Sequence, residues 1–173
     1  MKFRELLEQN YCARSDVIDA NALGRLLPTT PADIIEQFYS HHGRNNDFQT
    51  QYGEVKISNI IWVKVSLPAS EIVQCSYYEP FSKWYLNAEN RAAEFPQKSW
   101  ACIDIRKDVV EHWKTYYTWL KLPIFLQGNI LGLASQLRLV EGHTRVGLLS
   151  GLVKAGIIAM NSKHEIWLGQ HCV

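Results

Sequence analysis

An apolar strand that turns through one glycine into a glycine-containing apolar helix is the feature that most constrains this fold. The stretch reads LRLVEGHTRVGLLSGLVKAG, residues 137–156. Residues 137–140 have the length and apolar character of a short strand, and the residues from about Thr144 show helical spacing of apolar side chains. A strand that leads directly into a helix is typical of a domain in which helices pack on a sheet.

Two glycines interrupt the expected helix. Gly147 and Gly151 are four residues apart, so they lie on one helix face. Each costs about 1 kcal/mol of helix propensity relative to alanine, which implies a packing reason. We expect this face to bring the helix close to the sheet and Gly156 to end the helix. The buried stripe of the helix is expected to comprise Val146, Leu149, Leu152 and Val153.

The turn itself, EGHTR, combines turn chemistry with side chains that suit an anion. The first N–H groups of a helix have no acceptor inside it, and together with the helix dipole they attract anions. Gly142 lets the chain turn sharply or a ligand come close, and Thr144 is placed to cap the helix. His143 and Arg145 add donors suited to phosphate or carboxylate, while Glu141 fixes the turn. The turn therefore predicts a phosphate-binding site.

The same side chains also have packing explanations, which the sequence leaves open. Glu141 and Arg145 are four residues apart and can pair across the helix start. His143 can equally be a hydrogen-bonded turn histidine. Asp104 and Arg106 precede another expected helix, and they face either the ligand edge or solvent.

Composition limits the remaining function classes. The chain has 173 residues, of which 47% are hydrophobic and 20% charged, enough for one domain with a buried core. The formal net charge of +1 predicts no strong attraction to nucleic acid or to an anionic membrane. No apolar run approaches the roughly 18 residues of a membrane span, so we expect a protein that is not bound to a membrane.

The cysteines indicate a reducing compartment. Four are present, widely spaced and without a CxxC pair. The charged start MKFRELLEQN is unlike a secretory segment. We therefore expect free thiols in a cytoplasmic protein at Cys12, Cys75, Cys102 and Cys172.

The first 53 residues are expected to form an N-terminal helical extension and loop. One helix is predicted from a cap at Ser15 to Leu27, and a second from a cap at Thr30 to Tyr39. The polar stretch 41–53 is expected to be a linker or mobile loop. Its two histidines and one arginine have no spacing that favours a metal site.

Residues 54–173 are expected to form an α+β domain with a mixed sheet and packed helices. Aromatic residues crowd 71–100, which has no clear assignment. The elements predicted from periodicity and turn residues are strands at 60–67, 100–106, 122–127, 137–140 and 164–169, and a helix that begins at Lys107 and carries apolar residues to Leu120.

The order PIFL, a loop, LRLVEGHTR and then a glycine-containing apolar helix resembles the core motif of the ParB/sulfiredoxin-like superfamily. The resemblance covers about residues 100–169 and is strongest at 139–156. It implies an α+β fold in which the turn after a strand and the following helix start hold nucleotide phosphates. It also identifies the present chain as a divergent, stand-alone member.

Two departures from the family pattern narrow the expected activity. Sulfiredoxins have a cysteine at the place of His143, so sulfinic acid reduction is not expected. Partitioning ParB proteins carry consecutive arginines in the turn, where this chain has only Arg145 beside Thr144. They continue into a helix-turn-helix domain, which these 173 residues do not include. We expect binding rather than covalent catalysis, with no certain cofactor.

Two functions remain open. In the first, the turn binds a nucleotide or another phosphate-bearing small molecule. In the second, the chain is an immunity protein that neutralises a cognate bacterial toxin of the contact-dependent inhibition type through a protein–protein interface. Too many rings occur at 113–120 for one buried face, and such surplus aromatic residues are favoured as interface anchors.

Overall fold

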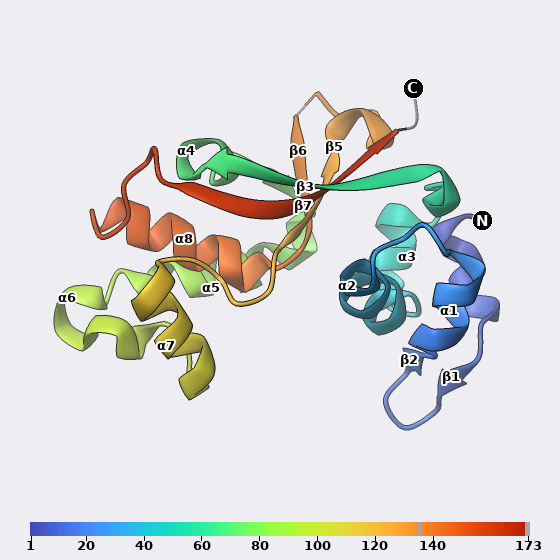
Figure 1. Cartoon of the computed structure of the whole chain (residues 1–173), viewed down its shortest axis with the longest axis horizontal. Helices are drawn as coiled ribbons and strands as arrows, with labels where there is room; N and C mark the ends of the chain where they lie inside the picture. Colours follow the sequence, from blue (N-terminus) through green and yellow to red (C-terminus); the bar gives the residue numbers. More distant parts are fainter. Residues whose placement is uncertain (135, 172–173) are drawn as a thin grey trace. The chain divides into compact units, whose positions relative to one another are not determined.

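The chain contains a five-stranded mixed sheet, a separate two-stranded sheet, and short and medium helices (Figure 1). The computed structural model describes residues 1–134 and 136–171. The strands are β1 Tyr11–Cys12, β2 Val17–Ile18, β3 Ile60–Pro68, β4 Ser76–Tyr77, β5 Ile124–Gln127, β6 Leu137–Glu141 and β7 Lys163–His171. The predicted α+β class is confirmed.

Helical elements connect these strands. They are η1 Phe3–Glu8, α1 Ala20–Leu26, α2 Ala32–Ile34, η2 Ile35–Ser40, α3 Asn46–Tyr52, η3 Ile57–Asn59, α4 Ala69–Ile72, η4 Glu79–Phe81, α5 Ser82–Ala92, α6 Phe95–Lys98, η5 Ser99–Cys102, α7 Lys107–Tyr116, η6 Gly128–Leu131 and α8 His143–Lys154. The η2 segment is a π-helix, and the other η segments are 3₁₀-helices.

The strand order in the large sheet is β3-β7-β5-β6-β4, with β4 parallel to β6. By contacts the chain divides into two units. Unit 1 contains residues 1–63 and the described parts of 126–136 and 168–173, and unit 2 contains 64–125 and 137–167. Three strands, β3, β5 and β7, have residues in both units.

Aromatic packing forms the core of unit 1. Phe3 and Phe38 stack with ring centroids 5.0 Å apart, and Phe48 and Tyr52 join the same buried cluster. Phe48 and Tyr52 lie on α3, which Asn45 caps by accepting hydrogen bonds from the next residues. The expectation of a linker or mobile loop at 41–53 is therefore wrong, because burying these two rings stabilises a helix in a polar segment.

The first two predicted helix caps are also wrong. The chain forms the β1–β2 hairpin where a helix from Ser15 was expected, and Asp19 caps α1 instead, accepting hydrogen bonds from two backbone N–H groups. Ser40 donates its hydroxyl proton to the carbonyl of Ile18, which ties this hairpin to η2. Thr30 is not the second cap, because Pro31 occupies that position and makes no side-chain cap bond.

Several other predicted elements are confirmed. Strands occur at β3, β5, β6 and β7, and β5 is a neighbour of β6 in the sheet. The helix α7 begins at the predicted Lys107 but ends at Tyr116, four residues before the expected Leu120, because Tyr117 adopts the left-handed conformation. Gly156 follows the end of α8 with a φ of +70°. Cys12, Cys75 and Cys102 are free thiols, burial raises the pKa of Cys75 to about 12, and Cys172 lies outside the described residues.

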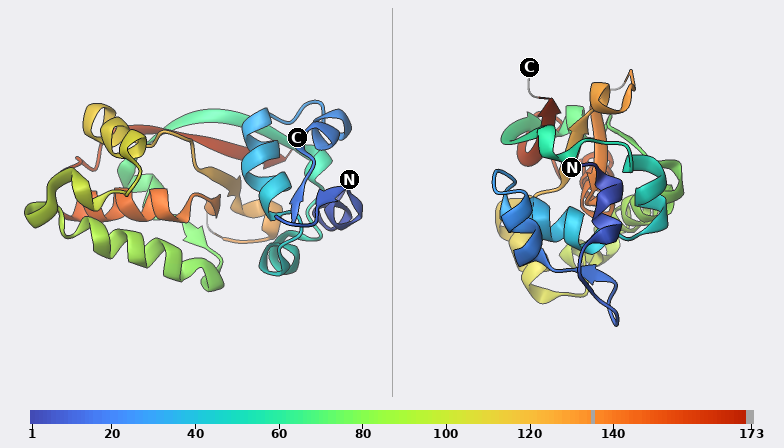
Figure 2. Two further views of the ribbon diagram at one scale, coloured as in Figure 1. Left: turned by 90° about the horizontal axis from the view of Figure 1, so that it is seen from below. Right: turned by 90° about the vertical axis from the view of Figure 1, so that its right-hand side faces the viewer.

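The glycine face of α8 packs on α5, not on the sheet as expected. A Cβ atom at Gly147 would collide with the backbone carbonyl oxygen of Tyr85, and one at Gly151 with that of Glu89. Figures 1 and 2 show α5 and α8 side by side. A carboxylate oxygen of Glu89 accepts hydrogen bonds from Ser150 and Lys154, each at 2.5 Å, which further joins the helices.

Replacing Gly147 with alanine tests this helix contact. The three atoms nearest to the new methyl group would all belong to the backbone of Tyr85 in α5, so we expect Gly147→Ala to lower the free energy of unfolding by about 1–3 kcal/mol. Gly24→Ala is the matched control, because Gly24 lies in α1 with open space at its Cβ position. It should be neutral or raise stability by up to about 1 kcal/mol. Urea unfolding measures both, and equal effects would contradict the packing account.

Candidate functional site

The predicted site turn lies between β6 and α8 in unit 2. Glu141 ends β6, Gly142 is the N-cap residue, and α8 begins at His143. Thr144 is thus not the cap that we expected, because the helix starts one residue earlier. Gly142 has a φ of +98°, and a Cβ there would lie 2.8 Å from the Cβ of Pro123. Both the backbone conformation and the available space therefore require glycine.

Arg145 is bonded into the protein. Its Nη1 donates to the carbonyl oxygens of Lys121 (2.8 Å) and Leu122 (3.1 Å), and its Nη2 donates to Glu141 Oε1 at 2.8 Å. Burial lowers the pKa of the guanidinium, and the Glu141 carboxylate opposes this effect. The local Glu141–Arg145 pair, one of the two explanations left open, is present. Through these hydrogen bonds, Arg145 joins the backbone of residues 121–122 to the turn.

His143 is packed among aromatic rings. Its residue is 6% exposed, and its ring meets the rings of Phe81 and Tyr77 edge to face, with centroids 5.2 Å and 6.3 Å away. Thr144, by contrast, is exposed. Of the two neighbouring side chains, Thr144 is therefore the one presented at the surface of the helix start.

The start of α8 differs from those of α1 and α3. Asp19 and Asn45 cap the two shorter helices with side-chain oxygens, whereas Gly142 has no side chain to offer. The first amide groups of an α-helix carry partial positive charge and have no acceptor inside the helix. At α8 the cap position thus supplies no side-chain oxygen to the first turn.

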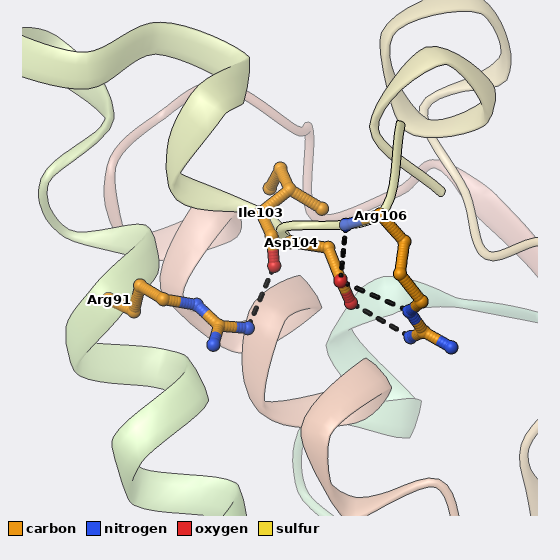
Figure 3. Close-up of polar contacts among 4 residues, drawn as sticks. All are labelled: Arg91, Ile103, Asp104 and Arg106. Carbon is orange, nitrogen blue, oxygen red and sulfur yellow. Dashed lines mark hydrogen bonds and ion pairs between the residues drawn. The ribbon is translucent and has the colours of Figure 1, made fainter. Parts of the chain in front are cut away.

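A second cationic group lies near this helix start. The charge of Arg106 acts on Arg145 and further lowers the pKa of that buried guanidinium. Arg106 itself forms a bidentate ion pair with Asp104, in which Arg106 Nε lies 3.1 Å from Asp104 Oδ1 and Nη2 lies 2.8 Å from Oδ2 (Figure 3). Of the two side chains that the sequence placed either at the ligand edge or in solvent, Arg106 therefore lies within electrostatic reach of Arg145.

The strand expected at 100–106 is wrong, and Figure 3 shows why. Asp104 Oδ1 also accepts a hydrogen bond from the backbone N–H of Arg106 at 2.9 Å, which bends the chain. Arg91 donates to the carbonyl of Ile103 at 2.7 Å and so occupies an acceptor that a strand would use. Ile105, at the bend, is 99% exposed.

A cavity of about 370 Å³ lies elsewhere in unit 2, and the sequence did not indicate it. Its walls come from the end of α7, the segment that follows α7, and the start of β7. The lining residues are His112, Tyr116, Thr118, Trp119, Leu120, Leu122, Lys163, His164 and Glu165. No local pattern could reveal it, because the two lining segments are about forty residues apart in the chain.

His164 lines this cavity, and both of its ring nitrogens bond to other side chains of the protein. Ser162 donates its hydroxyl proton to the carbonyl of Ala159, so its oxygen accepts from His164 Nε2 at 3.0 Å. The other ring nitrogen, Nδ1, then accepts from the Thr118 hydroxyl at 3.0 Å. This arrangement holds a neutral ring, and burial lowers the pKa of His164 to about 4.

The other polar residues noted in the sequence have packing roles. Arg44 lies over the ring of Tyr11, 3.6 Å from its centroid, and pairs with Asp16. His42 stacks on Phe48 with centroids 4.2 Å apart. Within residues 1–134 and 136–171, no three histidine, cysteine or acidic side chains are grouped so that they could hold a metal ion.

No protein-family model, curated protein or solved structure matches this chain. In the part of the chain that the structure describes, none of the helices is both long and apolar enough to cross a membrane. A functional proposal therefore depends on the geometry of the turn and the cavity.

The bonded state of His164 predicts a pH dependence of stability. Its pKa is about 4 in the folded protein and about 6.5 in an unfolded chain. Between these values the unfolded chain binds the extra proton, so the free energy of unfolding should fall as the pH drops from about 6.5 toward 4. Above pH 6.5 His164 should contribute no slope.

Urea unfolding at several pH values checks this for the wild type and for His164→Gln. We expect the stability advantage of the wild type over the variant to shrink steadily across this window. A constant difference between the two proteins from pH 4 to 7 would show that His164 does not titrate as described.

Proposed function

We propose that unit 2 binds a phosphate-bearing small molecule, such as a nucleotide, non-covalently at the start of α8. The observation that carries the proposal is the construction of this helix start. A glycine with no side chain occupies the cap, Thr144 is exposed beside it, and the charge of Arg106 acts on Arg145 in the first turn. Backbone N–H groups at a helix start, a hydroxyl and a guanidinium are donors that suit phosphate oxygens.

The proposal gives the residues of the turn different roles. Gly142 lets the chain turn closely past Pro123 and the Arg145 side chain, and Thr144 supplies a hydroxyl on an exposed residue. Arg145 and Glu141 act as positioning residues, because their bonds run to the protein itself. His143 anchors the helix start among aromatic rings. The order of β6, a glycine turn and α8 also supports our proposal that this is a divergent ParB/sulfiredoxin-like domain.

Charge alone does not drive the proposed binding. Asp104 offsets Arg106, and Glu141 offsets Arg145, so these four side chains sum to zero. The oriented amides and the dipole of a twelve-residue helix remain as the source of attraction. This zero net charge favours reversible binding of a small anion. It does not favour binding of nucleic acid, which depends on a strongly basic surface.

A carboxylate at position 144 provides a sharp test. We expect Thr144→Asp to bind ATP and tripolyphosphate at least about tenfold more weakly than the wild type, because it places a negative charge at the proposed phosphate position. The same change should leave the fold intact or stabilise it by about 0.3–1 kcal/mol, since an acid favours a helix start. Titration calorimetry measures binding, and thermal unfolding checks the fold.

Thr144→Ser is the matched control and should keep the wild-type affinity. Arg145→Ala is a poor substitute, because it also removes the bonds to two backbone carbonyls. Equal affinities of the aspartate and serine variants would rule out phosphate binding at this helix start.

A second proposal, binding to a cognate toxin as an immunity protein, draws on exposed apolar side chains at the two ends of α7. Ile105 precedes α7, and Tyr116, Tyr117 and Leu120 lie at its far end, all of them exposed. Exposed large apolar residues are characteristic of protein–protein contact surfaces. The buried rings of this region, Trp113 and Trp119, contact each other instead.

Ile105→Glu separates the two proposals. If a toxin contacts this surface, the wild type should restore growth of cells that produce the toxin, and Ile105→Glu should fail to do so. The variant should fold normally, because residue 105 is almost fully exposed, and it should bind nucleotide as the wild type does. Growth protection that is equal in the two proteins would argue against a contact through Ile105.

A further inference from the structure

One buried arginine of unit 2 has no acceptor for its hydrogen bonds. Arg138, the second residue of β6, is 8% exposed, and its Nε atom is buried without a hydrogen-bond partner. Among the residues that the structure describes, no carboxylate or carbonyl oxygen accepts a hydrogen bond from this side chain. Its two Nη groups are not sealed in the same way, so the outer edge of the guanidinium is accessible to a ligand.

The other three arginines of unit 2 have the acceptors that Arg138 lacks. Arg145 donates to two carbonyl oxygens and one carboxylate, and Arg91 donates to a carbonyl oxygen. Arg106 pairs with a carboxylate. Removing a guanidinium from water without such acceptors is strongly unfavourable, and buried charges in proteins are therefore paired. The burial of Arg138 thus calls for an acceptor that the described residues do not supply.

The side chains beside Arg138 do not offset its charge. The charge of Arg138 acts on Cys75 and lowers the pKa of the thiol, but burial has the larger effect and raises this pKa to about 12. The thiol therefore stays protonated and uncharged near neutral pH. Ser76, which lies opposite Arg138 in the register of β4 and β6, is also uncharged. The positive charge at this position is open to an anion from outside the chain.

Strand register places Arg138 on the face of the sheet away from α5 and α8. Tyr77 and Leu139 lie opposite each other in β4 and β6, and the ring of Tyr77 stacks on Tyr85 of α5 with centroids 4.8 Å apart. Side chains alternate between the two faces along a strand, so Arg138 points to the other face. His143, at the start of α8, also contacts the ring of Tyr77. The phosphate position proposed above and Arg138 therefore lie on opposite faces.

We propose that Arg138 binds the carboxylate group of a small organic acid, at a site separate from the start of α8. The two Nη groups of a guanidinium carry parallel N–H donors that match the two oxygens of a carboxylate. One guanidinium balances the single charge of a monocarboxylate, whereas a phosphate group carries about −1.5 to −2 near pH 7 and would keep an uncompensated charge. The bound carboxylate supplies the acceptor oxygens that Arg138 lacks in the protein.

NMR of the arginine side-chain N–H groups in the wild-type protein tests this proposal, with acetate as the probe. The Nε–H group of Arg138 is buried, so it exchanges slowly with water and its signal is observable. Acetate should shift this signal saturably, and chloride and inorganic phosphate should each bind at least about tenfold more weakly. Arg138→Met identifies the signal by its loss. Arg14→Met is the matched control, because Arg14 is exposed, and it should keep the full response to acetate.

Thermal unfolding gives a second readout. Arg138→Met removes an unpaired buried charge, so in a chloride buffer without carboxylates or phosphate the variant should unfold at a higher temperature than the wild type. Acetate should then raise the unfolding temperature of the wild type and leave that of the variant unchanged.

Three outcomes would overturn the proposal. The first is the absence of a saturable shift with acetate, and the second is a wild type more stable than Arg138→Met in the chloride buffer. The third is binding of phosphate as tight as that of acetate, which would contradict the assignment to carboxylates. Thr144→Asp should bind acetate as the wild type does, so a failure of the phosphate proposal at α8 would leave this one intact. Loss of acetate binding in Thr144→Asp would place the acetate at α8 instead.

Discussion

The close approach of α8 to α5 is the constraint on which the rest of unit 2 depends. Gly147 and Gly151 leave no side chain between the helices, and the carbonyl oxygens of Tyr85 and Glu89 occupy the space that larger residues would need. The axis of α8 is therefore set by backbone contact, which varies less than contact between flexible side chains. A helix held in this way presents its first turn at a defined position, as a ligand-binding helix start requires.

The Arg145 side chain then connects that helix start to the segment before β5. A mostly buried arginine is costly unless its donors are satisfied, and here a carboxylate and two carbonyl oxygens accept its hydrogen bonds. The same bonds explain why Gly142 must be glycine, since the Arg145 side chain and Pro123 fill the space where a Cβ would lie. The turn, the arginine and the backbone at Leu122 therefore form one hydrogen-bonded unit.

Local signals in the sequence predicted the elements whose patterns are strong. The strand at 60–68, the start of α7, and the strand–turn–helix around Gly142 follow from alternation, helical spacing and glycine placement. The failures have specific causes. Asp104 bends an alternating segment through its own side chain, and two buried rings make a helix of the polar stretch 41–53. In the first case a side-chain hydrogen bond overrides the local pattern, and in the second case the burial of two rings does so.

By itself, the sequence determined the sharp turn at Gly142, the helix behind it and the i, i+4 spacing that lets Arg145 meet Glu141. Each of these depends on backbone conformation or on neighbours within one helical turn. Only the tertiary structure decided that the glycine face meets α5, that Arg145 reaches the carbonyls of 121–122, and that residues of α7 and β7 line one pocket. Periodicity encodes which face of an element is buried, whereas the identity of the partner depends on contacts between residues far apart in the chain.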